Sequence, residues 1–356
     1  MDRYLVLENG MIFKGKALGA EGEVCAEIVF TTAMTGYLET LTDKSYTGQA
    51  VVQTFPLIGN YGVIPEDAEG DSVGAAAYIV REACEHPSNF RSKGGLGDYL
   101  QKNGVVGLCG IDTRALTRVL RERGVMNGII TDSPAKADPA ALAGFRITRP
   151  VAAVSPKRIT RAEAENSRFT VAMLDFGRKE NILRSLLARG CSVVIFPFDA
   201  SAEEILSCRP DGLFLTNGPG DPEDNSETIE TLRKLLLHRL PTMGICLGHQ
   251  LLALAHGFAT HKLKYGHRGS NQPVRCTAGG RIYITSQNHG YAVVSDSISP
   301  ADAEELFINV NDGTNEGLSY LHEPAFSVQF HPEACGGPQD TSFLFDNFIR
   351  LMEEQI

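Results

Sequence analysis

The chain has 356 residues, of which 43% are hydrophobic and 21% are charged, and its formal net charge is −10. This length suits two globular domains, each with a core large enough to need no disulfide or metal for stability. The acidic balance argues against general binding to nucleic acids or anionic membranes. Eight cysteines without a C-x-x-C pair, no apolar leader and no membrane-length apolar run predict a cytoplasmic protein in a reducing compartment.

The first part of the chain is typical of a mixed α/β domain. A hairpin is predicted for residues 4–13, where two strand-like runs flank the turn dipeptide Asn9-Gly10. Three further strands and one capped helix are expected at 28–30, 51–52, 77–80 and 112–123. Residues 133–168 are rich in Ala, Pro, Arg and Lys and show little apolar periodicity. We therefore predict a first domain over 1–145 and a connector over 146–168.

From residue 169 to residue 356, apolar runs alternate with helical patterns. Strands are expected at 170–174, 192–196, 212–215 and directly before residue 246, with helices ending near 190 and spanning about 227–238. This alternation predicts a doubly wound α/β domain with a parallel sheet. Such sheets bind ligands beyond the carboxyl ends of their strands. Two glycine-rich segments, 217–222 and 244–250, follow strands in this way, so we expect both to face one crevice.

Cys246 lies between Gly244 and Gly248, after an apolar run and before a helical pattern. Glycines on both sides permit a sharp strand-to-helix turn that presents the thiol at a helix N-terminus, as in a nucleophile elbow. The helix dipole favours a thiolate there, and the next backbone N–H can stabilise an oxyanion. Cys246 is therefore the leading catalytic candidate. The alternative is a buried small hydrophobic residue, a common role of free cysteine.

The segment His331-Pro332-Glu333 follows a strand-like run near the C-terminus. A cysteine nucleophile needs a base, and the base needs a third group that fixes its tautomer. The imidazole and the carboxylate of this segment suit these two roles, although the segment alone also fits a turn at a strand end. No further cluster of His and Cys has metal-ligand spacing, so no metal site is predicted.

Four motifs, in this order, resemble those of the triad-type (class I) glutamine amidotransferases. They are 217–222, 244–250, 286–291 and 331–333. Other segments are similar to the small chains of carbamoyl phosphate synthetases. These are 30–37, 41–49, 59–62, 109–117 and 266–269. The resemblance thus covers essentially the whole chain. One departure is Lys44, where that family usually has proline.

This resemblance implies that Cys246 attacks the side-chain amide of L-glutamine, while His331, oriented by Glu333, transfers the protons. The implied glutamine-contacting residues are Ser45, Gly218, Gly220, Leu247, Gln250, Asn288, Gly290 and Tyr291. The backbone N–H groups of Leu247 and Gly218 are implied to hold the oxyanion. From the sequence alone, Ser45 is explained equally well as a turn hydroxyl.

The resemblance also implies a large synthetase chain as partner in a heterodimer, which receives the ammonia and forms carbamoyl phosphate. This chain has no G-x-x-x-x-G-K-[ST] segment, so no cofactor is expected on it, and ATP and Mg are expected on the large chain. No nucleic-acid or membrane partner is expected. The product would serve arginine or pyrimidine biosynthesis, and the sequence leaves this choice open. A stand-alone thiol hydrolase of γ-glutamyl compounds and a non-catalytic scaffold stay open as alternatives.

Overall fold

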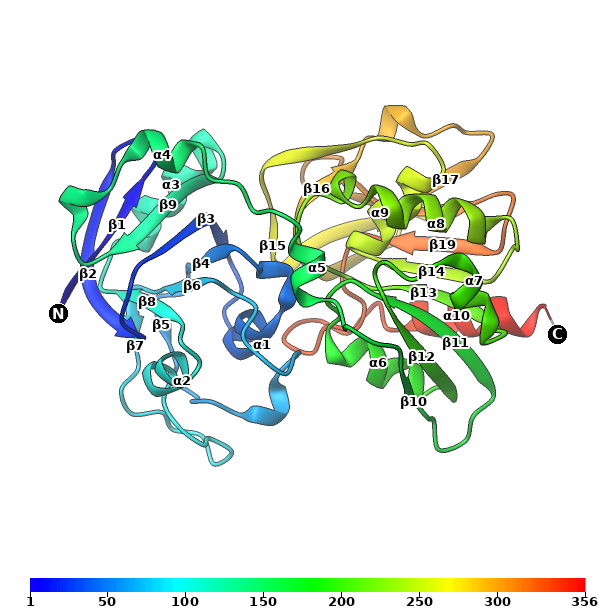
Figure 1. The fold of residues 1–356 in the computed structure, drawn as a ribbon, viewed down its shortest axis with the longest axis horizontal. Helices are drawn as coiled ribbons and strands as arrows, with labels where there is room; N and C mark the ends of the chain where they lie inside the picture. Colours follow the sequence, from blue (N-terminus) through cyan, green and yellow to red (C-terminus); the bar gives the residue numbers. More distant parts are fainter. Residues whose placement is uncertain (356) are drawn as a thin grey trace. The chain divides into compact units, whose positions relative to one another are not determined.

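The computed structural model describes residues 1–355, and the chain divides into two compact units, Met1–Thr148 and Arg149–Ile356 (Figure 1). The predicted connector, 146–168, lies across this division. It includes α5 (Pro150–Val154) and β10 (Thr160–Ala162), which both belong to the second unit. No helix among residues 1–355 is long and apolar enough to cross a membrane.

The first unit is built around a closed β-barrel (Figure 1). In barrel order its strands are β1 (Asp2–Leu7), β2 (Ile12–Gly19), β8 (Val106–Cys109), β6 (Ala77–Ile79), β4 (Gln49–Gln53), β3 (Val24–Thr31) and β9 (Met126–Thr131). Antiparallel pairing of β1 with β2 confirms the predicted hairpin, and Gly10 at the turn has φ 83°. Closure pairs every strand of the barrel on both sides, so the barrel has no open edge.

Short elements surround this barrel. They are α1 (Tyr37–Thr42), α2 (Leu96–Lys102), α3 (Thr113–Arg123), α4 (Pro139–Ala143) and the paired strands β5 (Leu57–Ile58) and β7 (Glu82–Ala83). The predicted start and stop signals of α3 are confirmed. The carboxylate of Asp112 accepts a hydrogen bond from the N–H of Ala115 at 2.9 Å, and Gly124 ends the helix with φ 100°. A polar N-cap and a C-terminal glycine satisfy the unpaired backbone groups at the two ends.

The second unit contains one mixed sheet with helices on both faces (Figure 1). Its strand order is β10, β12 (Cys191–Pro197), β11 (Phe169–Asp175), β13 (Gly212–Leu215), β14 (Thr242–Ile245), β19 (Ala325–Val328), β18 (Asn315–Tyr320), β17 (Ala303–Asn309), β15 (Thr260–Cys276) and β16 (Ile282–Val293). From β12 to β19 the pairing is parallel throughout. The predicted doubly wound α/β architecture is therefore confirmed.

The alternation of side chains along β11 explains why two layers of helices cover this sheet. Ala172 and Leu174 pack into one apolar cluster, whereas Val171 and Met173 pack into the other. The first cluster includes residues of α7 (Ala202–Ser207), α8 (Ser226–Leu236) and α9 (Leu247–Ala255); the second includes residues of α6 (Glu180–Leu187) and α10 (Phe343–Glu353). Strands buried on both faces are the expected consequence of parallel pairing with crossover helices.

Beyond β19 the sheet continues as an antiparallel extension through β18, β17, β15 and β16. The long pair β15 and β16 is irregular, with register shifts between Lys262 and His267 and between Gly269 and Gln272. Bulges of this kind bend a strand and redirect its side chains. The 286–291 motif lies within β16, which is the last strand of this extension, and its Ser286 accepts a hydrogen bond from the segment that follows β19.

Candidate active site

Cys246 occupies the sharp turn between β14 and α9, as predicted for a nucleophile elbow. Its φ of 54° and ψ of −104° lie outside the regions that residues with a side chain prefer. Such strain persists only where the surrounding structure enforces it, and it often marks a functional site. The residue is only 3% exposed and contacts the apolar core. Burial and a strained turn therefore occur together at this residue.

The two glycines of the motif are required by backbone contacts. A Cβ atom on Gly244 would lie 2.8 Å from the carbonyl oxygen of Gly248. A Cβ atom on Gly248 would overlap the carbonyl oxygen of Leu215, at the end of β13. The N–H of Gly248 also donates to the carbonyl oxygen of Thr216 at 3.0 Å. The helix can therefore approach the sheet closely only because neither position carries a side chain.

His331 and Glu333 follow β19, so they lie beyond the carboxyl end of a strand adjacent to β14. Their side chains form a hydrogen bond of 2.7 Å between Nδ1 and Oε1, and both are buried. Nε2 of His331 is buried and makes no hydrogen bond within normal distance among residues 1–355, although it interacts with the thiol of Cys246. Glu333 thus fixes the orientation of the imidazole while the opposite nitrogen stays available, which is the arrangement that a catalytic base needs.

Opposing effects set the protonation of this pair. Burial and the charge of Lys179 each lower the pKa of His331, but Glu333 and the thiol of Cys246 outweigh them and raise it to about 9. Burial acts to raise the pKa of Glu333, yet His331 and Lys179 hold it below its ordinary value. At neutral pH the pair is therefore an imidazolium beside a carboxylate, with a proton available for a leaving group.

The strand β16 connects the candidate glutamine-contacting residues to Cys246 and His331. Its Ser286 carbonyl oxygen accepts a hydrogen bond of 2.9 Å from the N–H of His331. The carbonyl oxygen of Asn288 lies 3.7 Å from Sγ of Cys246. On α9, Nε2 of Gln250 donates to the carbonyl oxygen of Tyr291 at 2.9 Å. The structure thus brings three separate motifs of the second unit together around the thiol.

The loop after β13 supplies Gly218 and Gly220. A Cβ atom on Gly218 would lie 2.6 Å from the carbonyl oxygen of Phe176 and 2.8 Å from the side chain of Leu247. Gly220 has φ 92°, a conformation suited to glycine. Leu247 is the first residue of α9, directly after Cys246, so its N–H lies at the positive end of the helix. Gly218 therefore lies against the residue that begins this helix.

Lys179 is a functional candidate that the sequence reasoning missed. Its Nζ lies 3.9 Å from Oε1 of Glu333, and only 9% of the residue is exposed. Its backbone N–H donates to Oδ1 of Asn217 at 3.0 Å. The one local signal is that Lys179 lies shortly after the strand predicted at 170–174, which places it at the carboxyl end of that strand but does not indicate its partner. The lysine places a second positive charge near the carboxylate that orients His331.

Ser45 lies in the first unit, within a short 3₁₀ helix, Lys44–Tyr46. Its N–H donates to Oδ1 of Asp43 at 2.9 Å, so a side chain caps this turn. The ammonium group of Lys44 pairs with Asp71 at 3.1 Å. Asp43 has ψ 114°, the extended conformation that a residue before proline favours, and Lys44 is the first residue of the 3₁₀ helix, a position where proline is common. A contact of Ser45 with glutamine stays a prediction.

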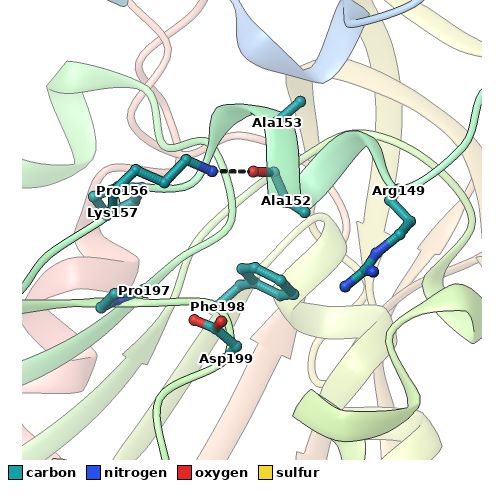
Figure 2. Close-up of a pocket in the computed structure, with 8 residues that line it drawn as sticks. All are labelled: Arg149, Ala152, Ala153, Pro156, Lys157, Pro197, Phe198 and Asp199. Atoms are coloured by element: carbon teal, nitrogen blue, oxygen red, sulfur yellow. Dashed lines mark hydrogen bonds between the residues drawn. The ribbon is translucent and has the colours of Figure 1, made fainter.

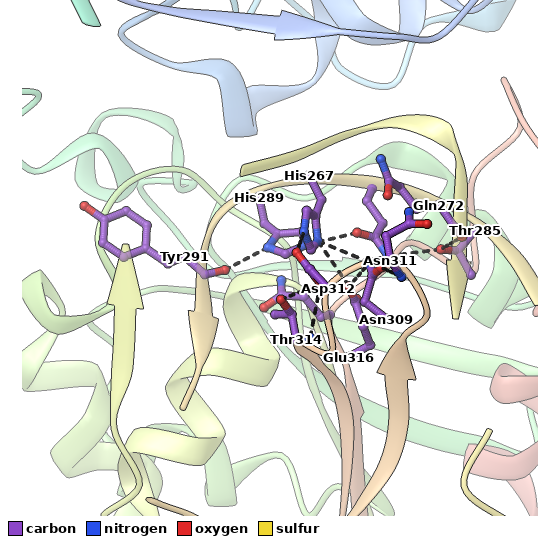
Figure 3. A network of polar contacts seen from close by, with 12 residues as sticks. His267, Gln272, Thr285, His289, Tyr291, Asn309, Asn311, Asp312, Thr314 and Glu316 are labelled. Atoms are coloured by element: carbon purple, nitrogen blue, oxygen red, sulfur yellow. Dashed lines mark hydrogen bonds and ion pairs between the residues drawn. The ribbon is translucent and has the colours of Figure 1, made fainter. Parts of the chain in front are cut away.

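Tertiary structure also assembles a group of potential metal ligands that the sequence spacing did not reveal (Figure 3). One ligand atom each from His267, His289 and Glu316 lies within 4.8 Å of the others. Both ring nitrogens of His267 already contact carboxylates, and both of His289 contact oxygen atoms of Tyr291 and Gln287. Protein groups therefore engage all four nitrogen atoms. The prediction that this chain needs no metal stays a prediction.

A surface pocket of the second unit lies between α5 and the segment after β12 (Figure 2). It is lined by Arg149, Ala152, Ala153, Pro156, Lys157, Pro197, Phe198 and Asp199. Five of its eight lining residues come from α5 and the residues next to it. None of the eight is a predicted glutamine-contacting residue.

Two family models match separate parts of the chain. Residues 172–351 match the family described as glutamine amidotransferase class-I. Residues 5–130 match the carbamoyl-phosphate synthase small chain, CPSase domain. The first match includes Cys246, His331 and Glu333, and the second includes the barrel strands and Ser45.

Full-length relatives carry the same description. The carbamoyl phosphate synthase small chain of Clostridium perfringens is 48% identical over 352 residues, covering 98% of this chain and 99% of the relative. That of Symbiobacterium thermophilum is 49% identical, covering 98% of each chain. That of Fusobacterium nucleatum is 46% identical, covering 100% of this chain and 99% of the relative. The chain therefore belongs to the family of carbamoyl phosphate synthase small chains, and its second unit carries the class-I glutamine amidotransferase domain.

Proposed function

We propose that this chain hydrolyses L-glutamine at a triad of Cys246, His331 and Glu333 and delivers the ammonia to a large synthetase chain. The family assignment supports a glutamine-hydrolysing subunit. The observation that carries the triad is the buried His331–Glu333 hydrogen bond beside a cysteine on a strained elbow. Glutamine contacts from Ser45, Gly218, Gly220, Leu247, Gln250, Asn288, Gly290 and Tyr291 are part of this proposal.

In the first half-reaction, the thiol proton of Cys246 passes to Nε2 of His331, and the resulting thiolate bonds to the side-chain carbonyl carbon of glutamine while the carbonyl electron pair moves onto the oxygen. The N–H groups of Leu247 and Gly218 stabilise the oxyanion, a contribution of about 3 kcal/mol for each donor in comparable sites. The carbon–nitrogen bond then breaks while the His331 imidazolium gives its proton to the nitrogen. Ammonia leaves, and a glutamyl thioester remains on Cys246.

In the second half-reaction, neutral His331 takes a proton from a water molecule. The resulting hydroxide attacks the thioester carbon, and the carbon–sulfur bond breaks to release glutamate and restore the thiolate. Glu333 holds the imidazole in one orientation through both steps, because its hydrogen bond to Nδ1 fixes which nitrogen faces the substrate. Lys179 supports this role by favouring the ionised form of Glu333.

The ammonia then serves a reaction that needs a second chain. We propose a heterodimer in the cytoplasm, in which ATP and Mg on the large chain convert bicarbonate and ammonia into carbamoyl phosphate for arginine or pyrimidine biosynthesis. The match of residues 5–130 to the small-chain domain supports this partner over a stand-alone γ-glutamyl hydrolase. Co-purification with a large ATP-dependent chain tests the partner directly.

Substitution of the nucleophile tests the catalytic proposal. We expect Cys246→Ala to lower glutamine hydrolysis by the full chain at least about 10³-fold, because no other group supplies the covalent step. Carbamoyl phosphate formation from free ammonia by the complex with the large chain should persist. Cys208→Ala, at a half-buried free cysteine of the same unit, is the control and should retain glutamine use. Wild-type rates of glutamine hydrolysis in Cys246→Ala would overturn the mechanism.

A further inference from the structure

The strand β16 pairs with β15 over most of its length, and the irregularities of this ladder arise from extra residues of β15. His267, Arg268 and Gly269 of β15 pair with His289, Asn288 and Gln287 of β16. Register shifts interrupt the ladder on both sides of these three pairs. The stretch includes Asn288, whose carbonyl oxygen contacts the Cys246 thiol, and it is followed by Gly290 and Tyr291. The three residues of β15 that pair with this stretch lie between two bulges, so contacts of the His267 side chain add to the backbone pairing that holds it.

A buried side-chain network lies at this stretch (Figure 3). Nε2 of His267 lies 2.8 Å from Oδ2 of Asp312, and Nδ1 lies 3.2 Å from Oε1 of Glu316. Nδ2 of Asn309 donates to the same oxygen of Glu316 at 2.8 Å. His267 is 7% exposed, and Glu316 is fully buried. The imidazole thus joins β15 to β18 and to the turn between β17 and β18.

The network continues from His267 into β16. The ring of His267 packs edge-on against the ring of His289, with centroids 4.9 Å apart and an interplanar angle of 84°. Nδ1 of His289 donates to the carbonyl oxygen of Tyr291 at 2.8 Å, and Gln250 donates to the same oxygen. The orientation of the His267 ring therefore constrains a carbonyl group that also contacts α9.

The two neighbouring imidazoles differ in charge. Burial disfavours protonation of His267, but Asp312 and Glu316 raise its pKa to about 9. Burial lowers the pKa of His289 well below its ordinary value, with further contributions from the charges of His267, Arg268 and His331. The ring of His267 thus has both nitrogens on carboxylates and packs edge-on against His289, so contacts from several strands fix its orientation.

We propose that His267, held between Asp312 and Glu316, is a positioning residue that fixes the segment Asn288–Tyr291 of β16 and thereby sets the affinity for glutamine. This inference rests on the proposed function, because it assumes that the segment contacts the substrate. His267 acts through His289 and the backbone of β16 and takes no part in proton transfer. Its loss should change substrate binding more than the chemical step.

The decisive experiment compares kinetic constants of full-chain variants in glutamine hydrolysis. We expect His267→Ala and Glu316→Ala to raise KM for glutamine about tenfold, the size expected for a lost charge-assisted hydrogen bond, with kcat changed less than about twofold. Glu316→Gln keeps an oxygen atom for His267 and Asn309, so it should restore KM to near the wild-type value. The control His322→Gln removes an exposed histidine–aspartate pair and should leave KM unchanged.

Alkylation of Cys246 distinguishes weaker glutamine binding from a general disruption of the site around the thiol. Iodoacetamide, which carries no glutamyl group, should react at the wild-type rate with every folded variant. A glutamine-like chloroketone should need about tenfold higher concentration to saturate His267→Ala, in proportion to the change in KM. If His267→Ala does not fold, Asp312→Asn provides a second variant. It lies at the partly exposed end of the network and should also raise KM for glutamine.

Several outcomes would overturn the inference. A folded His267→Ala with wild-type KM would show that the network does not affect binding. A fall in kcat at unchanged KM would place its effect on the chemical step. A stoichiometric metal in the purified chain that disappears in His267→Ala would make His267 a ligand instead. Failure of the wild-type chain to hydrolyse glutamine would refute the proposed function itself and is distinguished by that control.

Discussion

In the second unit, the imidazoles of His331 and His267 are both buried against carboxylates, and the pKa of each is raised to about 9. Glu333 engages one nitrogen of His331, and the other makes no hydrogen bond within normal distance among residues 1–355. Asp312 and Glu316 engage both nitrogens of His267. A buried histidine beside a carboxylate thus keeps one nitrogen available for proton transfer at His331. At His267, both nitrogens are held by carboxylates.

The two sites also differ in how the fold supports them. The His331 site lies beyond the carboxyl ends of parallel strands, on turns where backbone atoms leave no room for extra side chains. The His267 site lies within an antiparallel extension whose ladder is interrupted on both sides. We propose that backbone packing positions Cys246 and His331, whereas charged side chains position the strand β16.

The largest expected effect comes from replacing His331, whose Nε2 is the proposed proton donor. We expect His331→Asn to lower kcat for glutamine hydrolysis about 10³-fold, because the proton donor to the leaving ammonia is lost. KM should change little, in contrast to His267→Ala. Steady-state kinetics of both variants provide the test. If the two substitutions gave the same pattern of kcat and KM, the proposed difference in role would be wrong.

A smaller effect concerns the backbone contacts of the turn that carries Cys246, the proposed nucleophile. A Cβ atom on Gly248 would overlap the Leu215 carbonyl oxygen, so Gly248→Ala should lower the free energy of unfolding by about 2–3 kcal/mol. Urea unfolding measures this change. The control is Gly97→Ala in α2, where the nearest atom is a flexible side chain of Leu18 at 3.4 Å. That variant should be neutral or more stable, by at most about 1 kcal/mol. Equal effects would contradict the role of close backbone packing.

The smallest expected effect is a pH dependence of the contribution that His267 makes to stability. Because the folded-state pKa of His267 lies above the ordinary value of 6.5, its contribution to stability is complete below about pH 6.5 and is lost as the pH rises through about 9. The difference in unfolding free energy between the wild type and His267→Asn should therefore shrink across this window. Urea unfolding at several pH values tests this. His322→Gln should show no such trend, and a constant difference for His267→Asn would contradict the charged bridge.

Much of the second unit could be predicted because its signals are local. The apolar runs of β11, β12 and β13 and the glycines around Cys246 each specify a strand or a turn within a few residues. The sequence also indicated that His331 and Glu333 follow a strand. Since the carboxyl ends of parallel strands share one edge of the sheet, order along the chain was enough to expect them near Cys246.

The same reasoning could not find contacts that depend on register. Lys179 approaches Glu333 across more than 150 positions of the chain, and nothing in its local sequence specifies that distance. The group of His267, His289 and Glu316 arises because β15, β16 and β18 fold against one another. A shift of one residue in a strand pairing would turn these side chains to the opposite face.

The sequence by itself thus determined the parallel architecture, the elbow at Cys246 and the candidate partners His331 and Glu333, because periodicity and turn chemistry act over short distances. The tertiary structure alone decided which imidazole keeps a free nitrogen. That property depends on the positions of carboxylates brought from distant strands, and on burial strong enough to make each hydrogen bond matter.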